Sequence, residues 1–280
     1  MQAIGLFAAA LIAALGLGGG SAWAAFGHPV DWQLGLQDAA SPVMEDIVWF
    51  HDYLLLGIIT VIAAFVLALL IIVMIRFNAR SNPTPSRTTH NTAVEIAWTV
   101  VPVVILIFIA VPSFKLLFKQ LDLPPADLTV KATGNQWFWS YTYPDNGNFE
   151  FNSILVPDDK LKPGQPRLLT VDNELVVPVN KNVRVQTIGA DVIHSFAVPS
   201  FGIKIDSVPG RLNETWFKAT REGLYYGQCS ELCGRDHAFM PINVRVVSEQ
   251  AFATWLEDAK KKYVTKDNAR INLAAVQSGP

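Results

Sequence analysis

Two long apolar runs occupy the first half of the chain, and short apolar runs alternating with polar residues occupy the second half. Residues 54–75 form an uncharged run of 22, and residues 96–114 form one of 19. At about 1.5 Å per residue, either run makes a helix that can cross the apolar core of a bilayer. Helices buried in a soluble core are the alternative, but the length and close succession of the runs favour a transmembrane hairpin.

Charged residues beside these runs predict the orientation of the hairpin. The link between the runs carries three arginines and no acid before Glu95, whereas the segment from residue 25 to the first run carries five acids and no Lys or Arg. The positive-inside rule therefore places the link in the cytoplasm and both ends of the chain outside. Lys115 and Lys119, just beyond the second run, depart from this rule without reversing it.

Residues 1–24 have features of a secretory signal. An apolar stretch, residues 4–17, leads through glycines to Ala22-Trp23-Ala24, a small-x-small cleavage pattern. The basic residues that usually precede the apolar stretch are missing, so an uncleaved N-terminal helix is the alternative. We expect cleavage near Ala24.

Beyond residue 123 the pattern is typical of β-structure. Short runs rich in Val and Ile are separated by Pro, Gly, Asn and Asp, which favour turns. The predicted strands are residues 128–132, 137–143, 168–171, 183–188, 214–218 and 242–247. Many short strands without intervening helices favour a sandwich or barrel. An amphipathic stretch, residues 249–263, predicts a final helix.

Composition agrees with a membrane protein that carries an exported domain. Hydrophobic residues make up 51% of the 280 residues, and the net charge is −2. Residues 121–258 hold 17 acidic and 12 basic residues, so the predicted β domain is acidic. A basic partner protein would be steered onto such a surface. The chain has no glycine-rich nucleotide-binding motif, and we expect no nucleic-acid partner.

Both cysteines of the chain lie in one short segment, C-S-E-L-C-G-R-D-H-A-F-M, residues 229–240. Cys229 and Cys233 are followed at close spacing by His237 and Met240. Thiolate, imidazole and thioether groups are the ligands that hold copper. Two thiolates four residues apart can turn inward from one loop and bridge two metal ions. The segment therefore predicts a dinuclear copper centre, and His194, at the end of an apolar run, is the candidate for a second imidazole.

Three alternatives compete with this interpretation. Two cysteines in an exported domain ordinarily form a disulfide, and a structural anchor with a disulfide-bonded sandwich would need nothing more. A membrane-anchored copper chaperone or thiol-disulfide protein would use C-x-x-x-C with His194. A lone histidine such as His194 is more often structural. None of these alternatives gives His237 and Met240 a role.

The ordered motifs of the chain resemble those of subunit II of the haem-copper cytochrome c oxidases. The motifs are N-T-A-V-E-I-A-W-T at 91–99, G-N-Q-W-F-W-S-Y at 134–141, V-D-N-E-L-V-V-P at 171–178, D-V-I-H-S-F at 191–196, V-P-G-R at 208–211 and the copper loop. The resemblance implies a two-helix transmembrane hairpin plus an all-β cupredoxin-like Greek-key sandwich. It also implies a subunit that accepts electrons from cytochrome c at a copper A centre and passes them to haem in subunit I. Oxygen reduction, coupled to proton pumping, would occur in that other subunit.

The resemblance further implies a role for each donor of the copper loop. The implied metal ligands are His194, Cys229, Glu231, Cys233, His237 and Met240. The cysteines would bridge two copper ions, each histidine would bind one ion, and the methionine would bind weakly. Glu231 would bind through its main-chain carbonyl, and its side chain would help hold a magnesium ion shared with subunit I. From the residues alone, Glu231 is a solvated loop acid.

Other residues receive implied roles outside the loop. Trp137 is the expected point at which electrons enter, although core packing is the alternative for rings in this aromatic run. Asn135 and Phe138 stand where the family usually has His and Tyr, which puts any hydrogen bond from those side chains in doubt. Glu95 is the expected mouth of a proton path into subunit I, with an interfacial acid that reaches water as the alternative. The acids expected to attract a basic cytochrome c are Glu150, Asp172, Asp191 and Asp206, each of which could equally be ordinary surface charge.

We expect a chain in the bacterial inner membrane, with both termini and the copper domain on the periplasmic side. The expected segments are a signal peptide (1–24), an exported segment (25–53), helices at 54–75 and 95–115 joined by a cytoplasmic loop (76–94), a copper A domain (123–266) and a tail (267–280). Subunit I, subunit III and membrane lipid are the expected partners besides cytochrome c.

Overall fold

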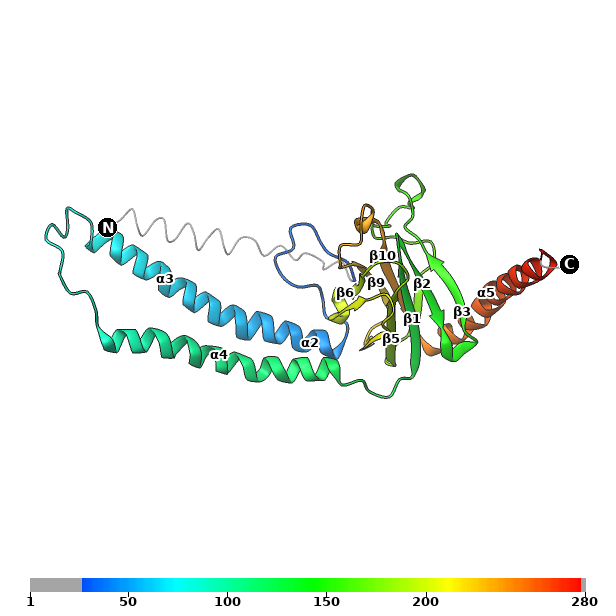
Figure 1. The fold of residues 1–280 in the computed structure, drawn as a ribbon, viewed down its shortest axis with the longest axis horizontal. Helices are drawn as coiled ribbons and strands as arrows, with labels where there is room; N and C mark the ends of the chain where they lie inside the picture. Colours follow the sequence, from blue (N-terminus) through cyan, green and yellow to red (C-terminus); the bar gives the residue numbers. More distant parts are fainter. Residues whose placement is uncertain (1–26, 278–280) are drawn as a thin grey trace.

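The computed structural model describes residues 27–277, with side chains as far as Tyr263 (Figure 1). The predicted signal peptide, residues 1–24, lies outside the described residues. Two long helices leave one side of a β-sandwich and run beside each other, and a third helix leaves the opposite side (Figure 1). The β-sandwich is therefore a compact unit joined to a hairpin of two long helices.

The hairpin consists of two helices that are long and apolar enough to cross a membrane. The first is continuous from Pro42 to Arg76, through α2 (Pro42–Val48), the π-helical η1 (Trp49–Leu55) and α3 (Leu56–Arg76). The second is α4 (Thr92–Leu121). The most apolar window of each helix is 0% buried within the structure, so the alternative of helices buried in a soluble core is wrong.

Capping side chains explain why both helices start before the predicted ranges. The hydroxyl oxygen of Ser41 accepts a hydrogen bond from the Met44 N–H, which starts the first helix well before residue 54. The side chain of Asn91 accepts hydrogen bonds from the N–H groups of Ala93 and Val94, which starts α4 at Thr92. The apolar runs thus mark the parts suited to lipid and not the whole helices.

In the described part of the chain, ten strands form two five-stranded sheets, in the orders β3-β2-β1-β5-β8 and β4-β10-β9-β6-β7. The strands are β1 (Leu128–Asn135), β2 (Phe138–Tyr143), β3 (Phe149–Ser153), β4 (Leu175–Pro178), β5 (Asn182–Gly189), β6 (His194–Val198), β7 (Ile203–Ser207), β8 (Asn213–Lys218), β9 (Gly223–Cys229) and β10 (Pro241–Val247). The pairs β1–β5 and β4–β10 are parallel and the other pairs are antiparallel. Strands far apart in the sequence therefore become neighbours, and a sandwich is confirmed.

Alternating burial along the strands builds the core between the sheets. In β1 and β5 every second residue is buried, as expected for strands with one face against the core. Helix α5 (Glu249–Gln277) lies against β3 and extends the core with Trp255 and Tyr263. The rings of Phe151 and Tyr263 stack with centroids 4.9 Å apart. The final helix is confirmed, although its backbone runs beyond the predicted residue 263.

The segment ahead of the first helix is part of the sandwich. Ala40 is fully buried in the core cluster, and its N–H donates to the Ser200 carbonyl over 2.8 Å. Its carbonyl accepts the Thr220 N–H over 2.9 Å. The Ser41 hydroxyl donates to the Phe201 carbonyl over 2.7 Å. The first helix is thus anchored to the sandwich before it begins.

One predicted strand is wrong, and five strands were not predicted. Residues 168–171 form a turn with a single bridge from Val171 to Leu155, because Leu168 has a φ of 64°, outside the β region. The strands that the pattern missed are β3, β4, β6, β7 and β9. Strands β3 (F-E-F-N-S) and β7 (I-K-I-D-S) do alternate, but each is only five residues long. The other three, β4, β6 and β9, show no regular alternation in their sequences.

Candidate metal centre

The predicted ligands converge at one end of the sandwich, between the two sheets. His194 is the first residue of β6 and Cys229 is the last residue of β9. These strands are antiparallel neighbours in which Phe196 pairs with Cys229. The loop that follows Cys229 returns the chain to β10 and carries the other donors. Two adjacent strands and one loop therefore supply the whole site.

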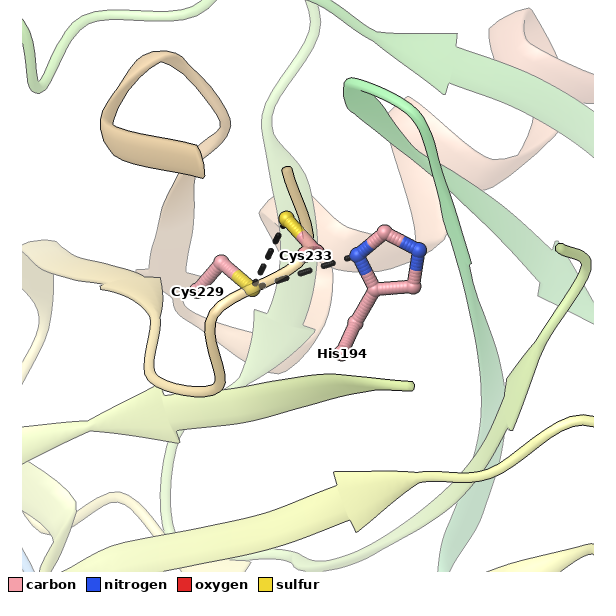
Figure 2. A group of neighbouring side chains, drawn as sticks. All are labelled: His194, Cys229 and Cys233. Atoms are coloured by element: carbon pink, nitrogen blue, oxygen red, sulfur yellow. Dashed lines mark hydrogen bonds between the residues drawn. The ribbon is translucent and has the colours of Figure 1, made fainter. Parts of the chain in front are cut away.

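Sulfur and nitrogen donors from these elements face one another (Figure 2). The Sγ atoms of Cys229 and Cys233 are 3.9 Å apart, and the Nδ1 atom of His194 lies 3.9 Å from the Cys229 sulfur. The Nδ1 atom of His237 and the Sδ atom of Met240 each lie 3.5 Å from the Cys233 sulfur. The ligand atoms of His194, Cys229 and Cys233 all lie within 4.8 Å of one another.

The geometry of the two sulfurs is compatible with bridged metal ions. Both cysteines are buried free thiols. Because a metal–thiolate bond is about 2.3 Å long, an ion can contact both sulfurs across the 3.9 Å gap, from either side of the line that joins them. Zinc is commonly held by thiolate and imidazole, but a buried thioether at Met240 favours copper. The donor set therefore fits a pair of copper ions.

Without a metal ion, the two thiols of the site differ in their pKa. Burial raises the pKa of the Cys229 thiol, but hydrogen bonds with His194 and the main chain lower it by more, so the net pKa is below the ordinary value. Burial and the neighbouring Cys229 sulfur raise the pKa of the Cys233 thiol. Burial lowers the pKa of His194, whereas Cys229 and Asp191 raise it by more. The first thiolate therefore forms at Cys229.

Asp191 fixes the orientation of the His194 ring. The Nε2 atom of His194 lies 2.8 Å from the carboxylate of Asp191, which leaves Nδ1 facing Cys229. The same carboxylate accepts the main-chain N–H groups of Gln136 over 2.8 Å and of Val192 over 2.7 Å. Burial raises the pKa of Asp191, but these hydrogen bonds lower it by more. Such a contact holds a ligand ring in place and makes it more basic.

Gly134 and Trp139 of the opposite sheet close the other side of this ring. A Cβ atom at Gly134 would lie 2.7 Å from the imidazole of His194, so a side chain there would displace the ring. The ring of Trp139 meets the imidazole edge-on, with centroids 6.1 Å apart. Its Nε1–H donates to the Met240 carbonyl over 3.2 Å. The packing of the two sheets therefore fixes the positions of both His194 and Met240.

Trp137 lies at the tip of the hairpin between β1 and β2, where it contacts the metal loop. Its Nε1–H donates to the carbonyl oxygen of Cys233 over 3.3 Å, and the Gln136 side chain donates to the same oxygen over 2.8 Å. The guanidinium of Arg235 lies 5.3 Å from the centroid of the Trp137 ring and is paired with Asp236. The ring is half-buried, whereas Trp139 is fully buried.

The remaining predicted residues divide into those at the site and those away from it. The main-chain carbonyl of Glu231 lies 3.4 Å from the Cys229 sulfur, and its side chain is exposed. Glu95 lies at the far end of α4, where its carboxylate accepts the Asn91 N–H over 3.3 Å. The structure does not bring three of the four docking candidates to the metal loop; Glu150, Asp172 and Asp206 lie on or beside other strands.

Sequence reasoning missed the supporting contacts of the site. Asp191 was predicted only as a docking acid, although its place three residues before His194 was a usable signal. Gln136 carried no signal, because its contact with Cys233 joins residues 97 apart in the sequence. Asn135, which replaces the usual histidine, bonds to the Thr133 carbonyl and the Ser140 hydroxyl and so stays within its own sheet.

Comparisons with known proteins agree with the architecture. The family model described as the periplasmic domain of cytochrome c oxidase subunit II matches residues 128–247, and the model of the transmembrane domain of that subunit matches residues 29–116. A probable cytochrome c oxidase subunit 2 of Rickettsia bellii is 52% identical over 244 residues, which span 87% of this chain and 90% of that protein. The cytochrome c oxidase subunit 2 of Cereibacter sphaeroides is 49% identical over 251 residues, which span 84% and 82%.

A solved structure is also similar in sequence. The periplasmic domain of subunit II of the cytochrome oxidase of Bradyrhizobium japonicum is 68% identical, with 51% of this chain and 99% of that one covered and a TM-score of 0.48. Both halves of the chain are thus matched by family models, and relatives are similar over most of its length. The chain belongs to the cytochrome c oxidase subunit II family.

Proposed function

We propose that the donors at the end of the sandwich hold a dinuclear copper A centre, through which this oxidase subunit receives electrons. The chain is a subunit of a cytochrome c oxidase, which is an oxidoreductase complex. When bound, the two copper ions would supply a one-electron relay between cytochrome c and the haem of subunit I. The observation that supports this proposal most is the 3.9 Å gap between two buried free thiols, with imidazole and thioether donors around it.

The residues around the donors would keep the site rigid. The carboxylate of Asp191 bonds to the His194 ring, and the indole N–H of Trp139 donates to the Met240 carbonyl. In the turn between β1 and β2, the indole N–H of Trp137 donates to the Cys233 carbonyl. A site that moves little when it gains or loses an electron transfers that electron quickly, and contacts of this kind also tune its potential. The weak ligand Met240 would tune the potential more than it anchors the metal.

Trp137 is the proposed point at which electrons enter. Its ring is half-buried in the turn between β1 and β2, and its indole N–H donates to the main-chain carbonyl of the proposed ligand Cys233. Part of the ring remains open to a docking protein. The acidic excess of residues 121–258 supports a basic donor, and Glu150, Asp172, Asp191 and Asp206 are its proposed docking acids.

Two further roles complete the proposal. The exposed side chain of Glu231 would share a magnesium ion with subunit I, because its carbonyl faces Cys229 while its carboxylate is free of the donor cluster. Glu95 would open a proton path into subunit I on the cytoplasmic side. Subunit III is a further proposed partner. The proposed location is the bacterial inner membrane, after removal of residues 1–24, with the sandwich on the periplasmic side.

Copper loading of the full chain tests the central claim. The chain, purified in neutral detergent and reduced, is loaded with copper, and its metal content, absorption and electron paramagnetic resonance are measured. We expect two copper ions per chain and one unpaired electron shared by two copper nuclei. A spectrum from a single copper ion would instead favour the copper chaperone, and a preference for zinc over copper would contradict the proposal.

A further inference from the structure

A hollow of about 680 Å³ lies between the two long helices at their sandwich end. Its walls include Asp46, Trp49, Phe50, Pro112, Lys115 and Lys119. Helices α2 and α4 run close together here (Figure 1). Lys115 directly follows the apolar run 96–114, so the hollow lies where the helices leave the apolar zone of the membrane. This is the level at which lipid headgroups begin.

One positive charge in this hollow is uncompensated. The ammonium of Lys119 pairs with the carboxylate of Asp46 and also donates to the Pro42 carbonyl over 3.4 Å. Within the described part of the chain, no hydrogen bond or ion pair engages the ammonium of Lys115, which is exposed. Two ammonium groups face one carboxylate, which leaves one net positive charge among the lining residues.

The other walls of the hollow suit the glycerol and upper acyl region of a lipid. Trp49 is 55% exposed, and Phe50 and Pro112 are half-buried. Tryptophan is enriched at the boundary between membrane and water, because its ring is apolar and its N–H is polar. The π-helical form of η1 begins at Trp49, and such segments are frequent at functional sites. A basic group above aromatic walls therefore faces the membrane boundary.

We propose that this hollow binds one anionic phospholipid through its phosphate group, with Lys115 as the cationic contact and Trp49 and Phe50 against the glycerol region. Basic pockets between transmembrane helices bind anionic headgroups on the cytoplasmic side of other membrane proteins, and the same attraction applies to an anionic headgroup at this end of the helices. A phosphodiester of charge −1 matches the single uncompensated ammonium. The proposal also accounts for two lysines on the side of the membrane where the positive-inside rule expects few. Lys119 joins the two helices through Asp46, and Lys115 contacts the lipid.

Native mass spectrometry of the full chain in neutral detergent tests this site. Phosphatidylglycerol or phosphatidylcholine is added, and bound lipid is counted for the wild type and for Lys115→Gln, Lys115→Arg and Lys204→Gln. We expect one phosphatidylglycerol to bind in preference to phosphatidylcholine, and Lys115→Gln to weaken it about fivefold. Lys115→Arg should restore binding. Lys204→Gln removes the same charge from an exposed position of β7 and should change nothing.

Further measurements distinguish a bound lipid from a free anion and from a covering subunit. Equal binding of both lipids, or no effect of Lys115→Gln in a variant with unchanged helicity, overturns the proposal. Competition by inorganic phosphate at the concentration of the lipid identifies a free-anion site and also overturns it. In the assembled oxidase at limiting lipid, Lys115→Gln should retain less phosphatidylglycerol than the wild type. An equal count there means that another subunit covers the hollow, which is the remaining result against the proposal.

Discussion

The indole N–H of Trp137 donates a hydrogen bond to the main-chain carbonyl of Cys233, over 3.3 Å. A half-buried aromatic ring is thereby joined to a buried metal-ligand candidate through one hydrogen bond and a short piece of main chain. The Gln136 amide reinforces the contact at the same oxygen. The turn between β1 and β2 thus supports the metal loop, which follows β9 in the other sheet. The proposed entry residue Trp137 and the proposed metal ligand Cys233 are therefore in direct contact.

Replacing Trp137 by phenylalanine should slow oxidation of cytochrome c without changing the copper spectrum. Phenylalanine keeps an aromatic ring but loses the N–H that bonds to Cys233 and part of the contact area. We expect a fall of about tenfold, since complete truncation of a tryptophan at the centre of an interface costs about 2 kcal/mol, or about thirtyfold, and phenylalanine retains part of the contact. Stopped-flow reduction of the oxidase measures the effect. Trp32→Phe, at a 95% exposed position outside the metal loop, is the control. Unchanged oxidation in Trp137→Phe would contradict the role.

The two sulfur ligand types should respond differently to substitution. Cys233→Ser removes one of the two proposed bridging thiolates, so we expect it to abolish the dinuclear spectrum. Met240→Leu retains the shape of a buried apolar side chain and both bridges, so we expect it to keep two copper ions and to shift the reduction potential. Electron paramagnetic resonance and redox titration distinguish these results. An intact dinuclear signal in Cys233→Ser would contradict the assignment of Cys233 as a bridging ligand.

Asp191→Asn should weaken copper binding by about tenfold to a hundredfold, the usual effect of removing a contact that orients a ligand. Asparagine keeps one acceptor oxygen, but it loses the second acceptor oxygen and the charge that supports the His194 ring. Competition with a copper chelator measures the affinity. Asp206→Asn, which removes an acid from β7 without touching a donor, is the control. Equal losses in both variants would assign the effect to general surface charge.

The same carboxylate predicts a pH dependence of the copper-free protein. The pKa of Asp191 is lowered in the folded state, so its charged form stabilises the fold at pH values above the ordinary carboxyl pKa of about 3.9. That stabilisation is lost as the pH falls through the lowered value. Denaturant unfolding should show wild type more stable than Asp191→Asn at neutral pH, with the difference closing in acid. A difference that grows in acid would mean that the pKa of Asp191 is raised on folding.

Glu95→Gln should slow proton uptake during turnover and leave reduction of copper fast. Glutamine retains an oxygen that can accept the Asn91 N–H, so the cap of α4 is preserved while the charge is removed. Flow-flash measurements with a pH dye follow the proton. If Glu95→Gln behaves as wild type and Glu95→Ala does not, the residue serves only the start of the helix.

Turnover with a basic cytochrome c should fall as ionic strength rises, because screening weakens attraction between opposite surface charges. Combining Glu150→Gln with Asp172→Asn should reduce this salt dependence, since both acids would lie within the docking surface. The carboxylate of Asp172 also accepts the Ile154 N–H, and asparagine can maintain that bond. Steady-state rates over a salt series provide the measurement, and a salt-insensitive rate would contradict docking through these acids.

The donors could be found from the sequence because four of them stand in one loop at close spacing, Cys229 to Met240. Most of their supports could not, because they come from other elements; Asp191, three residues before His194, was the one support whose position gave a signal. The bond between His194 and Asp191 depends on the turn that precedes β6, and the approach of Gly134 to the imidazole depends on how the two sheets stack. Apolar runs predicted both long helices but not their starts, which depend on Ser41 and Asn91. The strand expected at 168–171 failed on one backbone angle, that of Leu168.

The burial of Ala40 has a practical consequence for preparing the water-soluble part of this protein. A fragment that begins after the transmembrane hairpin would lack Ala40 and Ser41. The carbonyls of Ser200 and Phe201 and the N–H of Thr220 would then lose their present partners. It would also open a gap in the core where Ala40 now packs. A more faithful fragment would join residues 27–41 to residue 123 through a flexible linker, so that the excised membrane helices leave the sandwich complete.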